Sequence, residues 1–514
     1  MANPVILSAI FCTFSLVAFA QVPFGIQWQQ GFGGSSNDFV RVVKATSDGG
    51  YVIGGESNSN PSGNKTNVIH GFYDYWIVKV DSENNKQWEA AFGGDGFEQL
   101  SAIEQCSDGG YILGGFSDSS VSGSKTNSGF GGYDYWVIKI NSAGVKLWEK
   151  SFGGSGGDYL FGLQQTADGG YILGGQSGSS PSGNKTNVNF GNFDFWIVKL
   201  DGDGNKLWEK VYGGSSEDYF SSIQQTSDGG YILGGGSRSL VSGNKTSAGF
   251  GNFDFWIVKL DFNGNKQWDK SFGGVGNDDF SVVRQTIDGG YILGGYSSSG
   301  NSGNKTDAGF GLTDFWIAKL EADGTKIWDR CYGGTNNESL YSLQQTSEGG
   351  YILGGSSHSG SSGNKLAPAF GLQDYWIVKT DAVGNRLWDE AFGGSNSDAL
   401  LSLDLTLDGG FFLAGRSQSG VSGNKTTSTF GEFDFWTLKV GTPLQFKLLP
   451  LAPNNGFEAK LIGNSATDYI FQVSTNLLHW TPFLTNNSTN GVIFFSHTNP
   501  PIFPHRFYRA KEHP

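Results

Sequence analysis

Cysteine, proline and positive charge are all scarce in this chain of 514 residues. Three cysteines exclude a disulfide-dense scaffold, and thirteen prolines exclude a collagen-like chain. Lysine and arginine number 34 against 48 aspartates and glutamates, which gives a formal net charge of -14. Because phosphate binding needs clustered basic side chains, this balance argues against a nucleic-acid partner.

Aromatic residues and glycine, in contrast, are abundant. Aromatics make up 14 % of the chain and include 15 tryptophans, a content that excludes disorder over most of the length. Glycine accounts for 81 residues, well above the usual share of about 7 %. A globular chain rich in turns is therefore expected.

The first twenty residues have the pattern of a secretory signal peptide. An apolar stretch over residues 5–19 ends at Ala18-Phe19-Ala20, which matches a small-residue cleavage site, although no lysine or arginine precedes it. The stretch is short for a membrane span, which needs about 20 apolar residues. We expect cleavage after Ala20, no membrane span in the mature chain, and a secreted protein that is extracellular, at the cell surface or periplasmic.

A 60-residue repeat fills most of the chain. Tryptophan recurs at every sixtieth residue from Trp28 to Trp388 and again from Trp76 to Trp436. Seven copies of one unit therefore occupy residues 21–442, and periods of this size are typical of propellers and solenoids.

Each unit contains four strand signals. In the third full copy they are residues 160–166, 171–175, 194–200 and 206–212, short runs bounded by Gly, Asn and Asp. An Asp-Gly pair, Asp168-Gly169, marks the first hairpin. This pattern predicts an all-β fold, a seven-bladed β-propeller, rather than an open β-solenoid. The array opens with a lone strand, residues 26–32, which is expected to pair with residues 434–440 and close the last blade.

The composition changes after residue 442. Residues 443–514 hold eight of the thirteen prolines and three glycines. Alternating stretches at 469–473, 491–496 and 507–509 are typical of strands, and they predict a separate small β-sandwich-like domain.

The repeat W-x-x-x-F-G-G, D-G-G-Y-I-L-G-G and D-F-W-I-V-K-L-D-x-x-G-N resembles the DGGY-type propeller repeats of exported bacterial surface proteins, some of which are labelled glucanase-like. The tail is similar to a C-terminal module of secreted proteins from Verrucomicrobia-type bacteria, through Tyr469, Gln472, Ser474 to Leu477, Trp480 and Phe507 to Arg509. The resemblance implies export and a tail that serves attachment or sorting.

Most acidic residues are repeated with the unit. Three series of acidic residues, which start at Asp38, Asp48 and Asp74, recur at each 60-residue step, so the members of one series have equivalent environments. A glycosidase needs two acids in different environments, and turn hydrogen bonding explains the rings better. No histidine or cysteine spacing fits a metal, and no cofactor is expected.

Positions where the repeats differ carry the candidate sites. One set is expected to form a binding rim at the strand ends, with relaxed constraint at a solvent-exposed edge as the alternative: Glu56, Phe116, Gln176, Tyr296, Arg416, Asn58, Asp118, Arg238, His358 and Gln418. A second set of polar residues on the first strand of each unit is expected to line the channel: Lys44, Glu104, Gln164, Gln224, Arg284, Gln344 and Asp404.

Sevenfold symmetry without a singular catalytic cluster favours a non-catalytic binding or scaffold protein, expected to be a monomer, whose ligand is a glycan or a surface protein. The alternative is a carbohydrate-active enzyme, a glucanase-like hydrolase or lyase, with its site at the channel mouth. Convergence of Glu104, Arg284 and Asp404 in one pocket would favour that enzyme. A purely structural envelope component is a third hypothesis.

Overall fold

The structure is a computed structural model that describes residues 25–406, 409–441, 445–448, 457–462, 467–474, 479, 481–488, 492–497 and 507–512. These residues form strands, turns and loops and contain no helix, which confirms the predicted all-β class. No helix of the described part is long and apolar enough to cross a membrane. The predicted signal peptide, residues 1–20, lies outside the described residues, as does Trp480.

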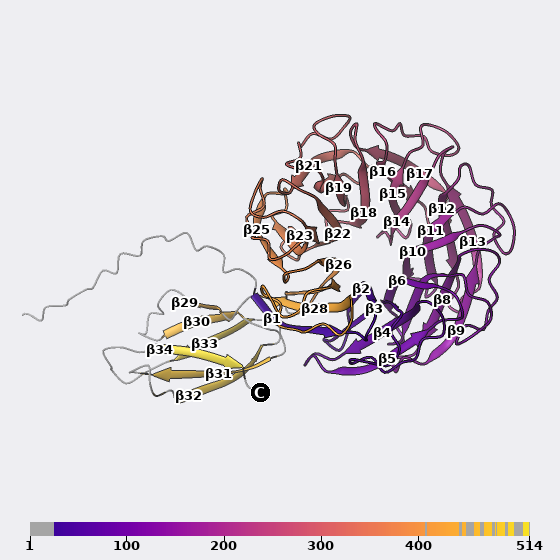
Figure 1. Ribbon diagram of the computed structural model, residues 1–514. Helices are drawn as coiled ribbons and strands as arrows, with labels where there is room; N and C mark the ends of the chain where they lie inside the picture. The colour runs from indigo at the N-terminus through magenta and orange to yellow at the C-terminus, as the bar shows by residue number, and fades with distance from the viewer. Residues whose placement is uncertain are drawn as a thin grey trace, which may run out of the picture.

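Repeated four-stranded antiparallel sheets make up the main body, as the sequence predicted (Figure 1). Six sheets take four consecutive strands each: β2 to β5 (Asp38–Ala45, Tyr51–Ser57, Asp74–Val80, Lys86–Phe92), β6 to β9 (Glu98–Gln105, Tyr111–Ser117, Asp134–Ile140, Lys146–Phe152), β10 to β13 (Asp158–Gln165, Tyr171–Ser177, Asp194–Leu200, Lys206–Tyr212), β14 to β17 (Asp218–Gln225, Tyr231–Ser237, Asp254–Leu260, Lys266–Phe272), β18 to β21 (Asp278–Gln285, Tyr291–Ser297, Asp314–Leu320, Lys326–Tyr332) and β22 to β25 (Glu338–Gln345, Tyr351–Ser357, Asp374–Thr380, Arg386–Phe392). A seventh sheet has the order β1 (Gly25–Phe32), β28 (Asp434–Gly441), β27 (Phe411–Ser417) and β26 (Asp398–Leu405).

The Asp-Gly turns form because each needs one residue in the left-handed region. Gly169 has a φ of 81°, and its N–H donates to the carbonyl oxygen of Thr166 at 2.9 Å. The carboxylate of Asp168 accepts from the N–H of Gly170 at 3.0 Å and forms an ion pair with Lys199 at 2.9 Å. The turn chemistry thus explains the recurring acid at this position.

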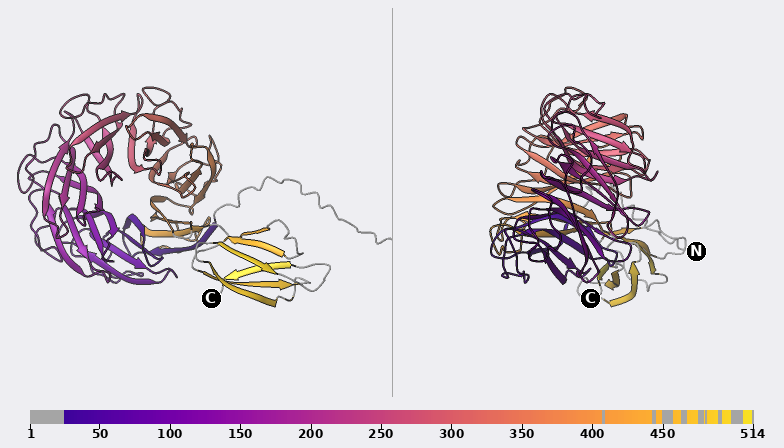
Figure 2. Two further views of the ribbon diagram at one scale, coloured as in Figure 1. Left: turned by 180° about the vertical axis from the view of Figure 1, so that it is seen from behind. Right: turned by 90° about the vertical axis from the view of Figure 1, so that its right-hand side faces the viewer.

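The two ends of the ring are joined by strand pairing and by contacts at the centre. Strand β1 pairs antiparallel with β28, with Gly31 opposite Trp436. At the inner edge, β2 and β26 lie side by side, and the N–H of Val43 donates to the hydroxyl of Ser402 at 3.0 Å. Figures 1 and 2 show the sheets arranged around a common centre, with β1 (indigo) beside β28 (orange).

The core lies between neighbouring sheets. Trp256 on β16 is fully buried and packs on Phe195 of β12, in the preceding sheet, with ring centroids 4.8 Å apart. Its indole N–H donates to the Asp269 carboxylate at 3.1 Å. Each fully buried tryptophan can remove on the order of 200 Å² from water, so this packing is a large part of the stability.

Six further strands follow the ring. Strands β29 (Gln445–Leu448), β30 (Phe457–Ile462) and β33 (Val492–His497) form one three-stranded sheet. Strands β32 (Thr481–Ser488), β31 (Thr467–Ser474) and β34 (Phe507–Glu512) form another. Strands β31 and β34 contain the predicted stretches 469–473 and 507–509, and β33 contains residues 492–496 of the third, whose first residue lies outside the described residues. The domain limits at residues 442 and 443 stay a prediction.

Candidate functional site

In each of the seven four-stranded sheets, the innermost strand carries a β-bulge, and the extra residue of the bulge faces the centre of the ring. In β10, Leu160 pairs with Gly175 and Gly162 pairs with Gly174, so Phe161 is left without a register partner. A bulge re-aims the extra residue, and here it turns that side chain into the channel. The seven bulge residues line one cavity of about 640 Å³ at the mouth of the channel: Arg41, Ser101, Phe161, Ser221, Ser281, Tyr341 and Leu401.

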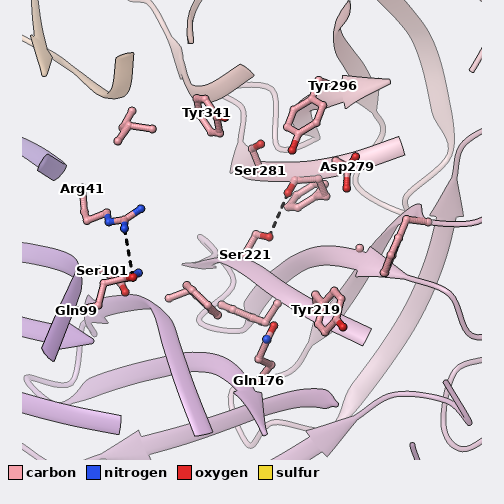
Figure 3. A pocket seen from close by; sticks show the side chains of 16 residues that line it. Arg41, Gln99, Ser101, Gln176, Tyr219, Ser221, Asp279, Ser281, Tyr296 and Tyr341 are labelled. Atoms are coloured by element: carbon pink, nitrogen blue, oxygen red, sulfur yellow. Dashed lines mark hydrogen bonds between the residues drawn. The ribbon is translucent and has the colours of Figure 1, made fainter. Parts of the chain in front are cut away.

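One side of this mouth cavity is aromatic (Figure 3). Tyr219 stacks on Phe253 with ring centroids 5.4 Å apart, and Tyr296 meets Tyr341 edge-on at 6.3 Å. Gly236 pairs with Tyr219 and lies against the Phe253 ring, at a position where the other repeats carry larger side chains. The aromatic side of the mouth can therefore offer both ring faces and phenol hydroxyls to a ligand.

The opposite side of the mouth is cationic and polar (Figure 3). The Arg41 guanidinium donates to both oxygens of the buried Glu56, with a shortest distance of 2.6 Å, and to the amide oxygen of Gln99 at 3.3 Å. Burial raises the pKa of Glu56, while Arg41 and Arg416 oppose the rise. Glu56 is thus a paired structural acid that fixes Arg41 at the cavity wall.

Asp279 is the one acid that lines the mouth cavity. It lies opposite Tyr296 across the β18–β19 pair. Burial, together with the neighbouring Asp278, raises the pKa of its carboxyl group. The mouth is therefore asymmetric in charge, with Arg41 on one side and Asp279 on the other.

The other end of the channel gathers the predicted channel-lining residues. All seven, from Lys44 to Asp404, line one cavity of about 480 Å³. Four of their side chains accept a backbone N–H of the next sheet: Glu104 from Gln165 at 3.0 Å, Gln164 from Gln225 at 2.6 Å, Gln224 from Gln285 at 2.7 Å and Asp404 from Ala45 at 2.9 Å. These bonds hold neighbouring sheets together at the inner edge.

The charges at this end are balanced. Burial raises the pKa of Glu104, and Lys44 and Arg284 counteract the rise. Burial lowers the pKa of Arg284, and Asp404 and Glu104 counteract that fall. Two basic and two acidic side chains therefore share the inner cavity, and Arg284 acts on both acids.

The predicted rim residues divide between the core, the mouth and the outer surface. Gln176 and Tyr296 line the mouth cavity, whereas Glu56 and Phe116 are buried. Arg416 is half-buried, with its guanidinium 5.3 Å from the Phe433 ring centre. The remaining five lie just past the strand ends, half-buried or exposed: Asn58, Asp118, Arg238, His358 and Gln418.

The bulge residues and Asp279 were missed from the sequence. Strict alternation from Lys44 places Val42 and Val40 toward the channel. Val42 does line the channel, but the bulge adds Arg41 to that lining, and Val40 is fully buried. The bulge residues could have been found from their variation among the repeats, because position 41 and its equivalents carry Arg, Ser, Phe, Tyr and Leu.

The remaining acidic rings are structural. Asp158 accepts from the N–H of Gly154 and the hydroxyl of Ser179, both at 2.7 Å, and is fully buried. Asp194 accepts from the N–H of Phe190 at 2.6 Å. No group of three or more metal-ligating side chains occurs in the part of the chain that the structure describes.

Comparisons with known proteins give remote similarities. No family model matches the chain. Over 129 residues the chain is 26 % identical to the regulatory protein FlaEY of Caulobacter vibrioides, a match that covers 24 % of this chain and spans 14 % of that protein's length.

Among solved structures, the chain is similar to the WD40 domain of Neurospora crassa Pan2, with 10 % identity and a TM-score of 0.44, over 83 % of this chain and 98 % of that one. It is similar to hydrazine synthase of Kuenenia stuttgartiensis, with 12 % identity and a TM-score of 0.43, over 74 % and 93 %. It is also similar to BBS1N in a complex with ARL6DN, with 9 % identity and a TM-score of 0.41, over 82 % and 98 %.

Proposed function

We propose that this chain is an exported, non-catalytic binding or scaffold protein, a seven-bladed β-propeller that takes its ligand, a glycan or a surface protein, at the channel mouth. One observation carries the proposal: a repeated frame presents five kinds of inward side chain, at seven equivalent positions, to one cavity. If the ring served only as a spacer, these positions would be expected to repeat like the tryptophans. Varied residues on a constant frame are typical of a binding surface.

The chemistry of the mouth suits a sugar or a polar protein segment. Aromatic faces stack on apolar ring surfaces, while phenol, serine and amide groups supply hydrogen bonds. Tyr219 and Tyr341 expose 38 % and 37 % of their surface, so both rings are accessible to a ligand. A cavity that combines accessible aromatic rings with polar groups suits the binding of a ligand.

A glycan array and a pull-down with the full chain test this proposal. Tyr296→Ala removes one wall of the mouth and is expected to lower any specific binding at least about tenfold. Phe262→Ala is the matched control, because Phe262 is an exposed aromatic (64 %) in the β16–β17 turn, away from the mouth. Binding that responds equally to both variants, or no binding at all, contradicts the proposal.

Export and surface attachment belong to the same proposal. The apolar stretch before Gln21 and the resemblance of the tail to a sorting module support them. Mass spectrometry of the mature protein from a secreting host is expected to give an N-terminus at Gln21. Deletion of residues 443–514 is expected to release the ring from the surface without stopping export.

A carbohydrate-active enzyme, hydrolase or lyase, is the second candidate, and one observation favours it. Glu104, Arg284 and Asp404 line the same inner cavity. The raised pKa of Glu104 suits a general acid, with Asp404 as the partner carboxylate. Hydrolysis of any member of a polysaccharide panel that is lost in Glu104→Gln and kept in Tyr296→Ala would favour this candidate over the first.

A further inference from the structure

Among the residues that the structure describes, Asp279 at the mouth lacks a hydrogen-bond or ion-pair partner for its carboxylate, whereas the neighbouring acids Glu56 and Asp278 both have one. Glu56 is held by Arg41, and Asp278 accepts from the N–H of Gly274 at 2.7 Å. The carboxylate of Asp279 has no hydrogen bond or ion pair within the described residues. The six equivalent positions, at 60-residue steps, carry Phe, Gln, Tyr, Tyr, Ser and Ala, so this charge occurs once in the ring.

Aromatic rings line the same cavity as this unpaired carboxylate. Tyr296 lies directly across from Asp279 in the strand pair, and Tyr341 meets Tyr296 edge-on. Tyr219 and Phe253 form the next part of the wall, beside Gly236, which carries no side chain. Figure 3 shows Asp279, Tyr296 and Tyr341 on one side of the cavity and Arg41 across it.

A half-buried carboxylate among aromatic faces attracts an organic cation. The negative face of each ring and the carboxylate charge act in the same direction on a cation placed between them. The chain already uses this interaction at the same edge, because the Arg238 guanidinium lies 4.4 Å from the Phe253 ring centre. A hard metal ion fits poorly, since one carboxylate supplies too few oxygen ligands.

We infer that the aromatic side of the mouth binds an alkylammonium group, which forms an ion pair with Asp279 and packs against Tyr219, Tyr296 and Tyr341. The inference rests on the proposed function and names the chemistry of its ligand. A quaternary ammonium and a primary amine share this chemistry, but the quaternary group costs less to dehydrate and covers the rings better. A quaternary ammonium is therefore the preferred ligand.

Calorimetric titration of the full chain with choline, and with its neutral isostere 3,3-dimethylbutan-1-ol, tests the charge requirement. Choline is expected to bind at least about tenfold more tightly than the isostere. Ethanolamine, which carries a primary ammonium, is expected to bind more weakly than choline, and the reverse order would assign the site to primary amines. Equal affinity of choline and the isostere overturns the inference.

Variants locate the site. Asp279→Asn keeps the shape of the side chain and is expected to abolish the preference for choline over the isostere. Tyr341→Ala is expected to weaken choline binding about tenfold, with thermal melting to confirm the fold. Glu321→Gln is the matched control, because this exposed acid lies in the β20–β21 turn at the far end of its sheet. Choline affinity unchanged in Asp279→Asn contradicts the inference.

The outcomes separate this inference from the proposed function. A glycan or protein ligand that is lost in Tyr296→Ala, without any selectivity for ammonium, removes the inference and leaves the proposed function intact. If no ligand binds less tightly to Tyr296→Ala or to Asp279→Asn, both the inference and the proposed function fail.

Discussion

Gln29 on the closing strand offers the sharpest test of how the ring is held together. Its Nε2 donates to the Asn424 carbonyl at 3.0 Å, and its Oε1 accepts from the Thr426 N–H at 2.9 Å and the Trp436 indole N–H at 3.2 Å. In each of the other six sheets a base and an acid three residues apart form an ion pair at this place. Lys206 donates to the Asn184 carbonyl, and Glu209 accepts from Thr186. Ile26 and Gln29 replace that ion pair in β1.

Gln29→Ala removes three hydrogen bonds and leaves the fully buried Trp436 without an acceptor. At about 0.5–1.5 kcal/mol for each bond, and more for a buried group left unpaired, the expected loss in the free energy of unfolding is about 2–4 kcal/mol. Gln29→Glu keeps the acceptor but loses the donor, and adds a half-buried charge with no base at position 26. Its expected cost is about 1–3 kcal/mol.

The double variant Ile26→Lys/Gln29→Glu restores the motif of the other sheets. A double-mutant cycle measured by urea denaturation, followed by tryptophan fluorescence, is expected to give a favourable coupling of about 1–2 kcal/mol. Gln87→Ala, on the exposed face of β5, is the control for loss of a glutamine and is expected to be nearly neutral. Strict additivity of the two changes, or a Gln29→Ala variant as stable as Gln87→Ala, would refute the reasoning.

Three further predictions concern the buried frame. Burial raises the pKa of Asp134 to about 7, so between pH about 4 and 7 the folded chain binds protons that the unfolded chain releases. The free energy of unfolding should therefore fall as pH rises through this window, less steeply in Asp134→Asn; a flat wild-type profile in urea denaturation contradicts this. Gly175→Ala places a Cβ 2.0 Å from the Tyr159 carbonyl oxygen and should cost about 1–3 kcal/mol or more, whereas Gly360→Ala meets nothing within 4 Å and should be neutral by thermal melting. Trp256→Phe removes a fully buried indole and its bond to a buried carboxylate, and is expected to cost about 2–4 kcal/mol in the same assay; a change below 1 kcal/mol would show that the site repacks.

Strand positions were predictable because they follow from local chemistry. Residues 194–200 and 206–212 were expected as strands and are β12 and β13 with the same bounds. The turn at Asp168-Gly169 was predictable for the same reason, since an Asp-Gly pair adopts the backbone that the hairpin needs. The pairing of β1 with β28 followed from counting strand types at the two ends of the array.

The site was predictable only in part. Residues such as Glu104 and Asp404 were identified as channel-facing because they are polar and differ among repeats, and they line the inner cavity. Phe161 was missed because a bulge has no local sequence signal in this strand, and simple alternation from Gln164 would place Phe161 on the opposite face. Glu56 varies like a rim residue, but its burial with Arg41 becomes visible only when the two strands are paired.

The sequence by itself determined the repeat, the strands, the turns and the closing strand, because each depends on residues close together in the chain or on a strict 60-residue period. The tertiary structure alone showed that the bulge residues and Asp279 share the mouth cavity, because these residues come from seven different sheets. Asp279 and Arg41 face each other across the mouth only when the seven sheets surround one centre.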